Sequence, residues 1–118
     1  MKDRSFPKSV RLNQAREIRR IFAKGAYRPL GLLSVKFLPR DQASSRFLIS
    51  IKKKVGHAPM RNRIKRLMRE AIRLERHRLE RPHDLCFMIT RTPNHPVTLH
   101  YLCRVLRKLF VELNESPQ

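Results

Sequence analysis

The alternation of apolar and polar residues along this chain predicts six elements of secondary structure. Apolar residues recur at helical spacing in three segments, and in three others they alternate with polar residues or run together as in strands. In chain order the pattern predicts a helix over residues 13–24, strands over 32–38 and 46–54, a helix over 59–79, a strand over 83–91 and a helix over 97–113. The resulting order, α-β-β-α-β-α, is typical of an α+β fold with helices packed on a small sheet.

The first predicted helix has an apolar stripe and a clear C-terminal end. Its apolar stripe consists of Ala15, Ile18, Ile21 and Phe22. Gly25 follows the last helical residue and is suited to end the helix.

The chain contains no linker segment, so residues 1–118 are expected to form one domain, with residues 1–10 as an extended arm.

The predicted strands differ in how polar they are. Apolar and polar side chains alternate in residues 32–38 and 46–54. The turn-forming residues 39–45 between them predict that the two strands form an antiparallel hairpin. Residues 83–91 are mostly apolar, which indicates a central strand.

The helix predicted over residues 59–79 combines an apolar stripe with dense positive charge. At about 100° per residue, seven apolar side chains fall within an arc of about 160°. These are Met60, Ile64, Leu67, Met68, Ala71, Ile72 and Leu74. The stripe can dock on a sheet, so the opposite side chains are expected to face outward. That face carries Asn62, Lys65, Arg66, Arg69, Arg73 and Arg76, with Arg61 and Arg63 at the edges of the stripe.

The outward face of this helix is suited to phosphate. Like-charged pairs four residues apart, such as Arg61–Lys65 and Lys65–Arg69, each cost a few tenths of a kcal/mol, roughly. A polyanion would offset this cost, and guanidinium groups bind phosphate through paired hydrogen bonds. Lys52–Lys54 and the helix N-terminus near Pro59 add positive charge and free N–H groups. An ordinary solvated charged face is the alternative.

The overall charge extends this interpretation to the whole chain. The 28 Lys and Arg residues against 9 Asp and Glu give a formal net charge of +19 over 118 residues. Such a chain attracts polyanions, with nucleic acid as the first candidate and an acidic membrane surface as the second. No apolar run approaches the roughly 20 residues of a membrane helix, and the N-terminus lacks a signal-peptide core. We therefore expect a cytoplasmic protein.

The sequence offers little for catalysis by the protein itself. A metal-dependent nuclease needs clustered carboxylates, whereas the acidic residues here are scattered and the histidines have no ligand spacing. We expect no catalytic residue and no metal site. Cys86 and Cys103 lack C-x-x-C spacing and are expected to be reduced, buried thiols.

Three segments together resemble a known family. “VGHAPMRNRIKRLMR” (55–69) resembles the Arg-Asn-Arg motif region of the bacterial ribonuclease P protein subunit. “FPKSVRLNQAREIRRIFAKG” (6–25) resembles that family's N-terminal arm and first helix, and “FLISIKKKVG” (47–56) the strand before its motif helix. The similarity covers nearly the whole chain, and Arg61-Asn62-Arg63 is its most specific part.

The resemblance implies a fold and a function. The fold is an α/β sandwich like domain 2 of ribosomal protein S5, with a small mixed sheet and an unusual left-handed β-α-β crossover. The family is the protein subunit of an endonuclease that removes the 5′ leader of precursor tRNA. Its RNA subunit performs the hydrolysis with Mg²⁺, which the RNA mainly binds, and the protein carries no catalytic residues. The expected partners are this catalytic RNA and precursor tRNA.

The resemblance and the charge pattern together give candidate site residues. Those expected to contact RNA are Lys52, Lys53, Lys54, Arg61, Asn62, Arg63, Lys65, Arg66, Arg69 and Arg73. The leader is expected in a cleft between the first helix and the sheet, with Ile18, Phe22, Lys36 and Ser50 as candidates. The family often has aromatic residues at both the Ile18 and Phe22 positions.

Several alternatives remain open from the sequence. Phe22 could equally belong to the core, and Lys36 and Ser50 could face either the cleft or solvent. The alternative function is a structural RNA-binding protein, such as a ribosomal one, without a role in cleavage. A basic segment lying on an acidic membrane is disfavoured because the apolar stripe of the basic helix is needed to cover the sheet and lacks Trp and Phe.

Overall fold

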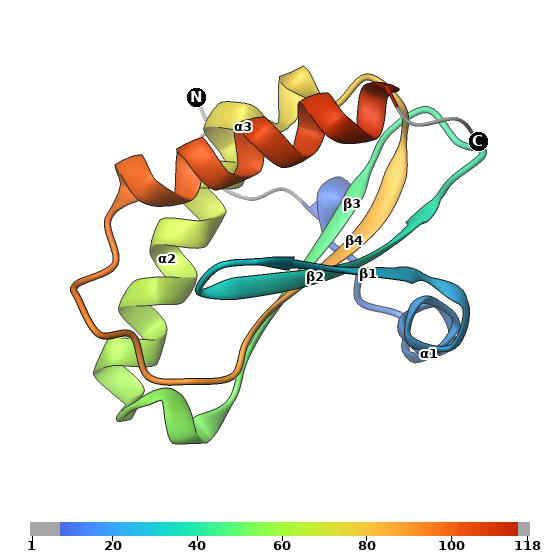
Figure 1. Ribbon diagram of the computed structural model, residues 1–118. Helices are drawn as coiled ribbons and strands as arrows, with labels where there is room; N and C mark the ends of the chain where they lie inside the picture. Colours follow the sequence, from blue (N-terminus) through green and yellow to red (C-terminus); the bar gives the residue numbers. More distant parts are fainter. Residues whose placement is uncertain (1–7, 116–118) are drawn as a thin grey trace.

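The computed structural model describes residues 8–115, which form a four-stranded sheet with helices on both faces (Figure 1). In chain order the elements are the 3₁₀ turn η2 (Lys8–Val10), α1 (Ala15–Lys24), β1 (Ala26–Leu30), β2 (Leu33–Pro39), β3 (Arg46–Ile51), the 3₁₀ turn η3 (Lys53–Val55), α2 (Ala58–Glu75), the 3₁₀ turn η4 (Arg76–Arg78), β4 (His83–Ile89) and α3 (Leu99–Glu115). All six predicted elements are present, and the α+β class is confirmed.

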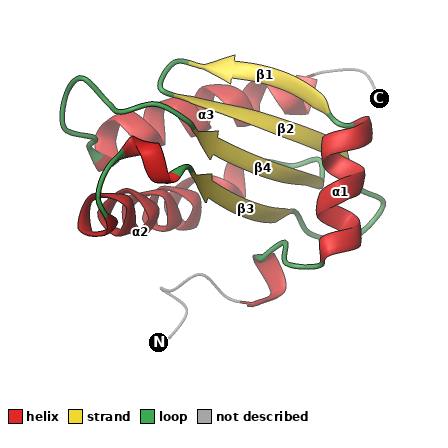
Figure 2. Ribbon diagram, turned by 90° about the horizontal axis from the view of Figure 1, so that it is seen from below, coloured by secondary structure: helices red, strands yellow, loops and turns green. Residues whose placement is uncertain are grey.

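The strand order in the sheet is β1-β2-β4-β3 (Figure 2). β2 pairs antiparallel with β1 and β4, whereas β3 and β4 are parallel and connected through α2. The antiparallel hairpin predicted between residues 32–38 and 46–54, which correspond to β2 and β3, is therefore wrong. β4 is buried along nearly its whole length, and it takes the place between β2 and β3 because that position covers both of its edges.

Strand β1 was missed by the sequence analysis. It is an edge strand with mostly exposed side chains, so it has no apolar alternation to detect. Its Pro29 is tolerated because an edge strand leaves some N–H groups without a neighbouring strand. The turn to β2 is made by Gly31, whose φ of 83° is favourable only for glycine.

The ends of other elements also differ from the prediction. The strand predicted over 46–54 stops at Ile51, and residues 53–55 form η3. Residues 8–10 of the predicted extended arm form a 3₁₀ turn, and the rest of that arm lies outside the described residues. Gly25 ends α1 as predicted, because a Cβ there would lie 2.5 Å from the Ile21 carbonyl oxygen.

The sheet separates two cores. On one face, α2 and α3 pack over a large apolar core that includes Val35, Phe47 and Phe87. On the other face, α1 and the residues before it cover a smaller core of Leu12, Ile21 and Cys86, with further side chains packed around it. Figures 1 and 2 show α1 on the sheet face opposite α2 and α3.

Both cysteines are buried free thiols, as predicted. Burial raises the pKa of Cys86 to about 11, so this thiol stays protonated at neutral pH. The two side chains therefore contribute packing and no chemistry.

The buried face of α2 includes one acidic residue. Glu75 is 4% exposed, whereas Leu74, predicted in the stripe, is 38% exposed. The Glu75 carboxylate accepts hydrogen bonds from Arg78 Nε (2.7 Å) and from Arg107 Nη2 on α3 (2.9 Å). The prediction that Leu74 lies in the buried stripe was therefore wrong, and Glu75 is buried beside α3, where the distant Arg107 pairs with its charge.

The Glu75 ion pairs predict a pH dependence of stability. The hydrogen bond from Arg107 lowers the pKa of Glu75, with burial acting in the opposite direction. A lowered folded-state pKa gives stability that is present above the unfolded-state pKa and is lost as the pH falls through the folded-state pKa. We therefore expect the difference in unfolding free energy between the wild type and Glu75→Gln to shrink between about pH 6 and about pH 3. Urea unfolding at several pH values measures this difference, and a constant difference would contradict it.

Candidate nucleic-acid interface

The N-terminus of α2 is fixed by contacts within one turn of the chain. His57 caps the helix, its Nδ1 accepting a hydrogen bond from the Met60 backbone N–H at 3.2 Å. Pro59 lies in the first turn, where it is favourable. Arg61 Nε donates to the Gly56 carbonyl oxygen at 3.0 Å, which leaves the terminal nitrogens of this guanidinium for other acceptors.

The basic side chains of α2 face away from the sheet. Ile64, Met68, Ala71 and Ile72 are fully buried against the core. On the other side of the helix, the exposed residues are Asn62, Arg63, Arg66 and Arg69, and Lys65 is half-buried. The predicted orientation of the helix is therefore confirmed, with the exception of Leu74.

Most of these cations have no acidic partner within residues 8–115. No ion pair to a carboxylate forms there for Arg63, Lys65, Arg66 or Arg69. Arg73 differs, because its Nε and Nη2 donate to the two Glu70 oxygens at 3.0 and 2.5 Å. The charge of Arg73 is thus largely offset, which makes it the weakest of the predicted RNA contacts on α2.

Three consecutive lysines lie just before α2. Lys52, Lys53 and Lys54 are all exposed. The η3 turn that carries them is fastened by Thr92, whose Oγ1 donates to the Val55 carbonyl at 2.9 Å. The lysines therefore extend the positive face of α2 beyond its N-terminus.

A second candidate surface lies where α1 meets β2. Lys36 Nζ donates to the Phe22 carbonyl at 2.8 Å and lies 5.8 Å from the centre of the Phe22 ring. Phe22 is 42% exposed, so it does not belong to the core. Ile18 is half-buried against the small core, and Ser50 lies on the same face of the sheet in β3. The structure thus brings Phe22 and Lys36 together, whereas much of Ile18 is used in packing.

A partly buried ion-pair network that the sequence analysis did not identify links α1 to the sheet. Arg46 of β3 donates to both Asp84 oxygens at 2.9 Å and to Glu17 of α1 at 2.6 Å. These hydrogen bonds raise the pKa of Arg46 above its ordinary value. Asp84 is 4% exposed. The sequence did contain a signal for this ion pair, because Arg46 begins β3 and Asp84 lies near the start of β4, and both strands are otherwise largely apolar.

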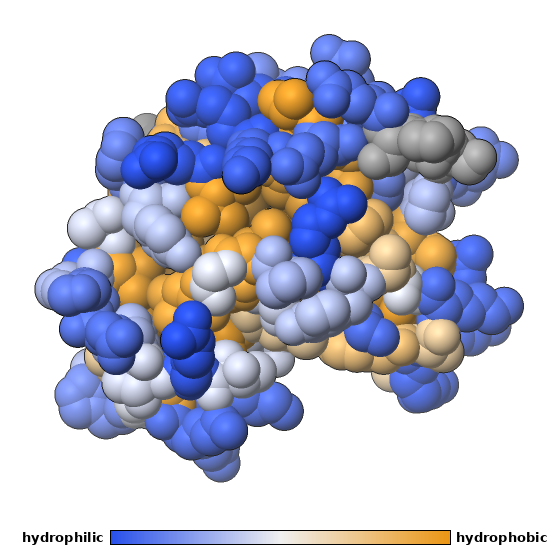
Figure 3. All heavy atoms as spheres, viewed as in Figure 1, coloured by the Kyte–Doolittle hydropathy of each residue, from blue (hydrophilic) through white to orange (hydrophobic). Residues whose placement is uncertain are grey.

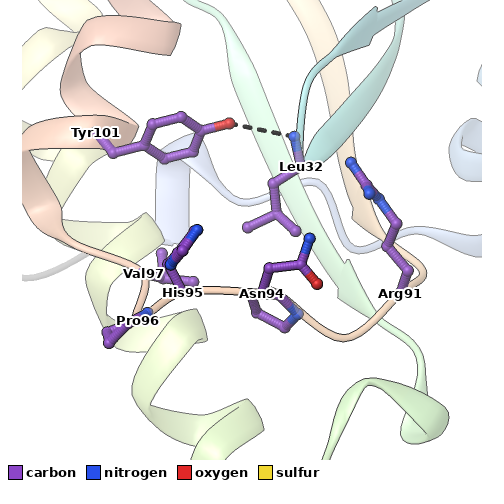
Figure 4. A pocket seen from close by; sticks show the side chains of 8 residues that line it. Leu32, Arg91, Asn94, His95, Pro96, Val97 and Tyr101 are labelled. Carbon is purple, nitrogen blue, oxygen red and sulfur yellow. Dashed lines mark hydrogen bonds between the residues drawn. The ribbon is translucent and has the colours of Figure 1, made fainter.

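A further pocket is lined by other residues. Figure 3 shows hydrophobic side chains gathered in the hollow beneath α3, and a cavity of about 300 Å³ lies beside the β1–β2 turn. In Figure 4 the side chains of Asn94, His95 and Tyr101 surround it, and the Tyr101 hydroxyl accepts a hydrogen bond from Leu32 N–H at 3.1 Å. None of the predicted site residues lines this pocket.

The described residues contain neither a cluster of metal ligands nor a helix able to span a membrane. Across residues 8–115 no group of three or more His, Cys, Asp or Glu side chains could hold a metal ion. In the same range, every helix is too short or too polar to cross a bilayer.

Together, the fold and its exposed cationic helix define a small basic α+β protein suited to bind a polyanion. The model of the family described as Ribonuclease P matches residues 6–114. This chain belongs to the ribonuclease P protein family.

Relatives agree with this assignment. The ribonuclease P protein component of Bacillus pumilus is 34% identical over 104 residues, which cover 87% of each chain. That of Dictyoglomus thermophilum is 39% identical over 72 residues, 61% of this chain and 60% of that protein. The fold is similar to that of the Staphylococcus aureus RNase P protein, with a TM-score of 0.74 at 24% identity over 92% of this chain and 97% of that one.

Proposed function

We propose that this protein, as the protein subunit of ribonuclease P, binds the catalytic RNA through the outward face of α2 and the 5′ leader of precursor tRNA beside α1. Membership of the family gives it a role in tRNA processing within a ribonucleoprotein. In this proposal the RNA performs the hydrolysis, and the protein positions the substrate and the RNA relative to each other.

The observation that carries the proposal is the exposed cationic face of α2. Arg63, Arg66 and Arg69 are exposed and have no carboxylate partner in the described part of the chain. Their mutual repulsion costs stability, which RNA phosphates would offset. Lys52–Lys54 extend the same face beyond the helix N-terminus.

The surface beside α1 is suited to single-stranded RNA. The exposed ring of Phe22 offers one stacking platform, and the Lys36 ammonium next to it can pair with a phosphate. Stacking one base contributes about 1–3 kcal/mol, which corresponds to a gain in affinity of about 5- to 150-fold. Ser50 and the partly covered Ile18 would add a polar and an apolar contact.

Mg²⁺ has no protein ligand set in this proposal. The described residues contain no cluster of carboxylates or histidines that fits the ion. We therefore expect Mg²⁺ to be held by oxygen atoms of the RNA partners, where phosphates are its natural ligands.

A cleavage assay tests the proposed function. Catalytic RNA with precursor tRNA at limiting Mg²⁺ is expected to remove the leader faster when the protein is added. Substrates with a long leader and with a one-nucleotide leader serve as the matched pair, and only the former should gain from the Phe22 surface. If the protein binds the RNA without changing the rate, it is a structural RNA-binding protein instead.

A further inference from the structure

The open edge of β3 separates two basic helices. Figure 2 shows β3 at the border of the sheet, with α2 near one end and α1 near the other. The segment before α1 pairs with only the beginning of this edge, through an Arg11–Phe47 bridge and a hydrogen bond from Leu12 N–H to the Phe47 carbonyl at 2.9 Å. Within residues 8–115, no other strand covers this edge farther along β3.

A small niche at this edge gathers basic and amide groups from three elements. Its volume is about 260 Å³. Its polar lining consists of Arg11 and Asn13 from the segment before α1 and of Lys65 and Arg69 from α2. The floor is formed by residues 47–49 of β3, where the Phe47 carbonyl already accepts the hydrogen bond from Leu12 N–H. Cationic side chains gathered with an amide side chain around one niche can bind an anionic oxygen, such as that of a phosphate.

The positive charge continues from this niche onto α1. Arg16, Arg19, Arg20 and Lys24 are all exposed on this helix. Its only acidic residue, Glu17, is paired with Arg46. Within residues 8–115 no carboxylate pairs with Arg16 or Arg20, which stand four residues apart and repel each other. This helix therefore repeats the charge pattern of α2 on the other face of the sheet.

We infer that a continuous phosphate-binding track runs from α2 through the niche at the β3 edge to Arg16 and Arg20 of α1. Its ligand is the phosphodiester backbone of the same RNA that α2 binds, so the inference rests on the proposed function. The strand that passes α2 is held in the niche by Arg11, Asn13, Lys65 and Arg69. It then continues along the outer face of α1, away from the surface of Phe22 and Lys36.

The salt dependence of RNA binding tests this track. Arg16→Gln/Arg20→Gln removes two exposed charges four residues apart, and Arg104→Gln/Lys108→Gln removes two with the same spacing from α3. Each lost phosphate contact lowers the slope of log affinity against log salt by about 0.7–0.9. With the catalytic RNA we expect the α1 variant to lower the slope by about 1.4–1.8 and the α3 variant to leave it nearly unchanged. Arg16→Lys/Arg20→Lys should keep the wild-type slope.

Other outcomes would overturn the track without affecting the proposed function. An α1 variant that behaves like the α3 control, while Arg63→Gln/Arg66→Gln still lowers the slope, would remove α1 from the interface. An effect seen only with precursor tRNA would assign α1 to the substrate and break the continuity with α2. If the first α1 variant unfolds, as followed by circular dichroism, the single variants Arg16→Gln and Arg20→Gln supply the comparison, and each should lower the slope by about 0.7–0.9.

Discussion

Replacing Arg63 and Arg66 by glutamate is expected to lower the affinity for the catalytic RNA by about 10²–10⁴-fold. Hydrogen bonds to charged groups contribute about 1.5–3 kcal/mol each, and two such contacts are lost. Both side chains are exposed and have no carboxylate partner within the described residues, so the fold should be retained. Filter binding at several salt concentrations measures both the loss of affinity and the smaller salt slope.

The control for this experiment must change the net charge equally. Arg104→Glu/Lys108→Glu does so on α3, which lies on the same face of the sheet as α2. If both variants lost affinity to the same extent, the overall charge of +19 would be responsible instead of a specific helix face. Circular dichroism should show the same helix content in both variants. An unfolded Arg63→Glu/Arg66→Glu protein would instead make these residues structural.

Local periodicity explains what the sequence predicted well. The apolar positions of α2 repeat at the helical period, and this repeat alone places Ile64 and Met68 inside and Arg66 and Arg69 outside. The apolar run of β4 similarly predicts a central strand. Both predictions depend on residues that are neighbours in the chain, so no tertiary contact is needed to make them.

Long-range pairing explains what the sequence predicted wrongly. The short turn predicted over residues 39–45 suggested a hairpin, but the choice of neighbouring strand depends on β4, which begins more than 30 residues after β3 ends. Glu75 is buried against α3, where the distant Arg107 pairs with its carboxylate in addition to the nearby Arg78. In both cases a partner is distant in sequence, and a local pattern does not contain it.

The candidate site also has one part that follows from local sequence and one part that depends on distant contacts. The contacts proposed on α2 follow from one helix and could be named from the sequence. The surface beside α1 depends on the distance between Phe22 and Lys36, which β1 and β2 fix through their pairing. Since β1 was not predicted, the sequence could not decide that Phe22 is exposed.

Removing Arg46 is expected to separate stability from leader binding. Arg46→Met leaves the Asp84 carboxylate buried with only Arg40 near it, at 3.4 Å, and should cost about 3 kcal/mol of unfolding free energy. Glu17→Gln removes only the more exposed half of the network and should cost about 0.2–1 kcal/mol. Urea unfolding of the two variants measures both values.

A double variant then isolates the role of this network in function. In Arg46→Met/Asp84→Leu the buried ion pair is replaced by apolar side chains, and half-buried Arg40 loses Asp84 but keeps its hydrogen bond to the Ser44 carbonyl, so much of the stability should return. The link from β3 to Glu17 of α1 is still absent, and the surface of Phe22 and Lys36 should be less well ordered. We expect this stable protein to bind the catalytic RNA normally while losing the advantage for long-leader substrates. If it kept that advantage, the ion pairs would serve stability alone and α1 would be positioned by its apolar packing on Leu12 and Cys86.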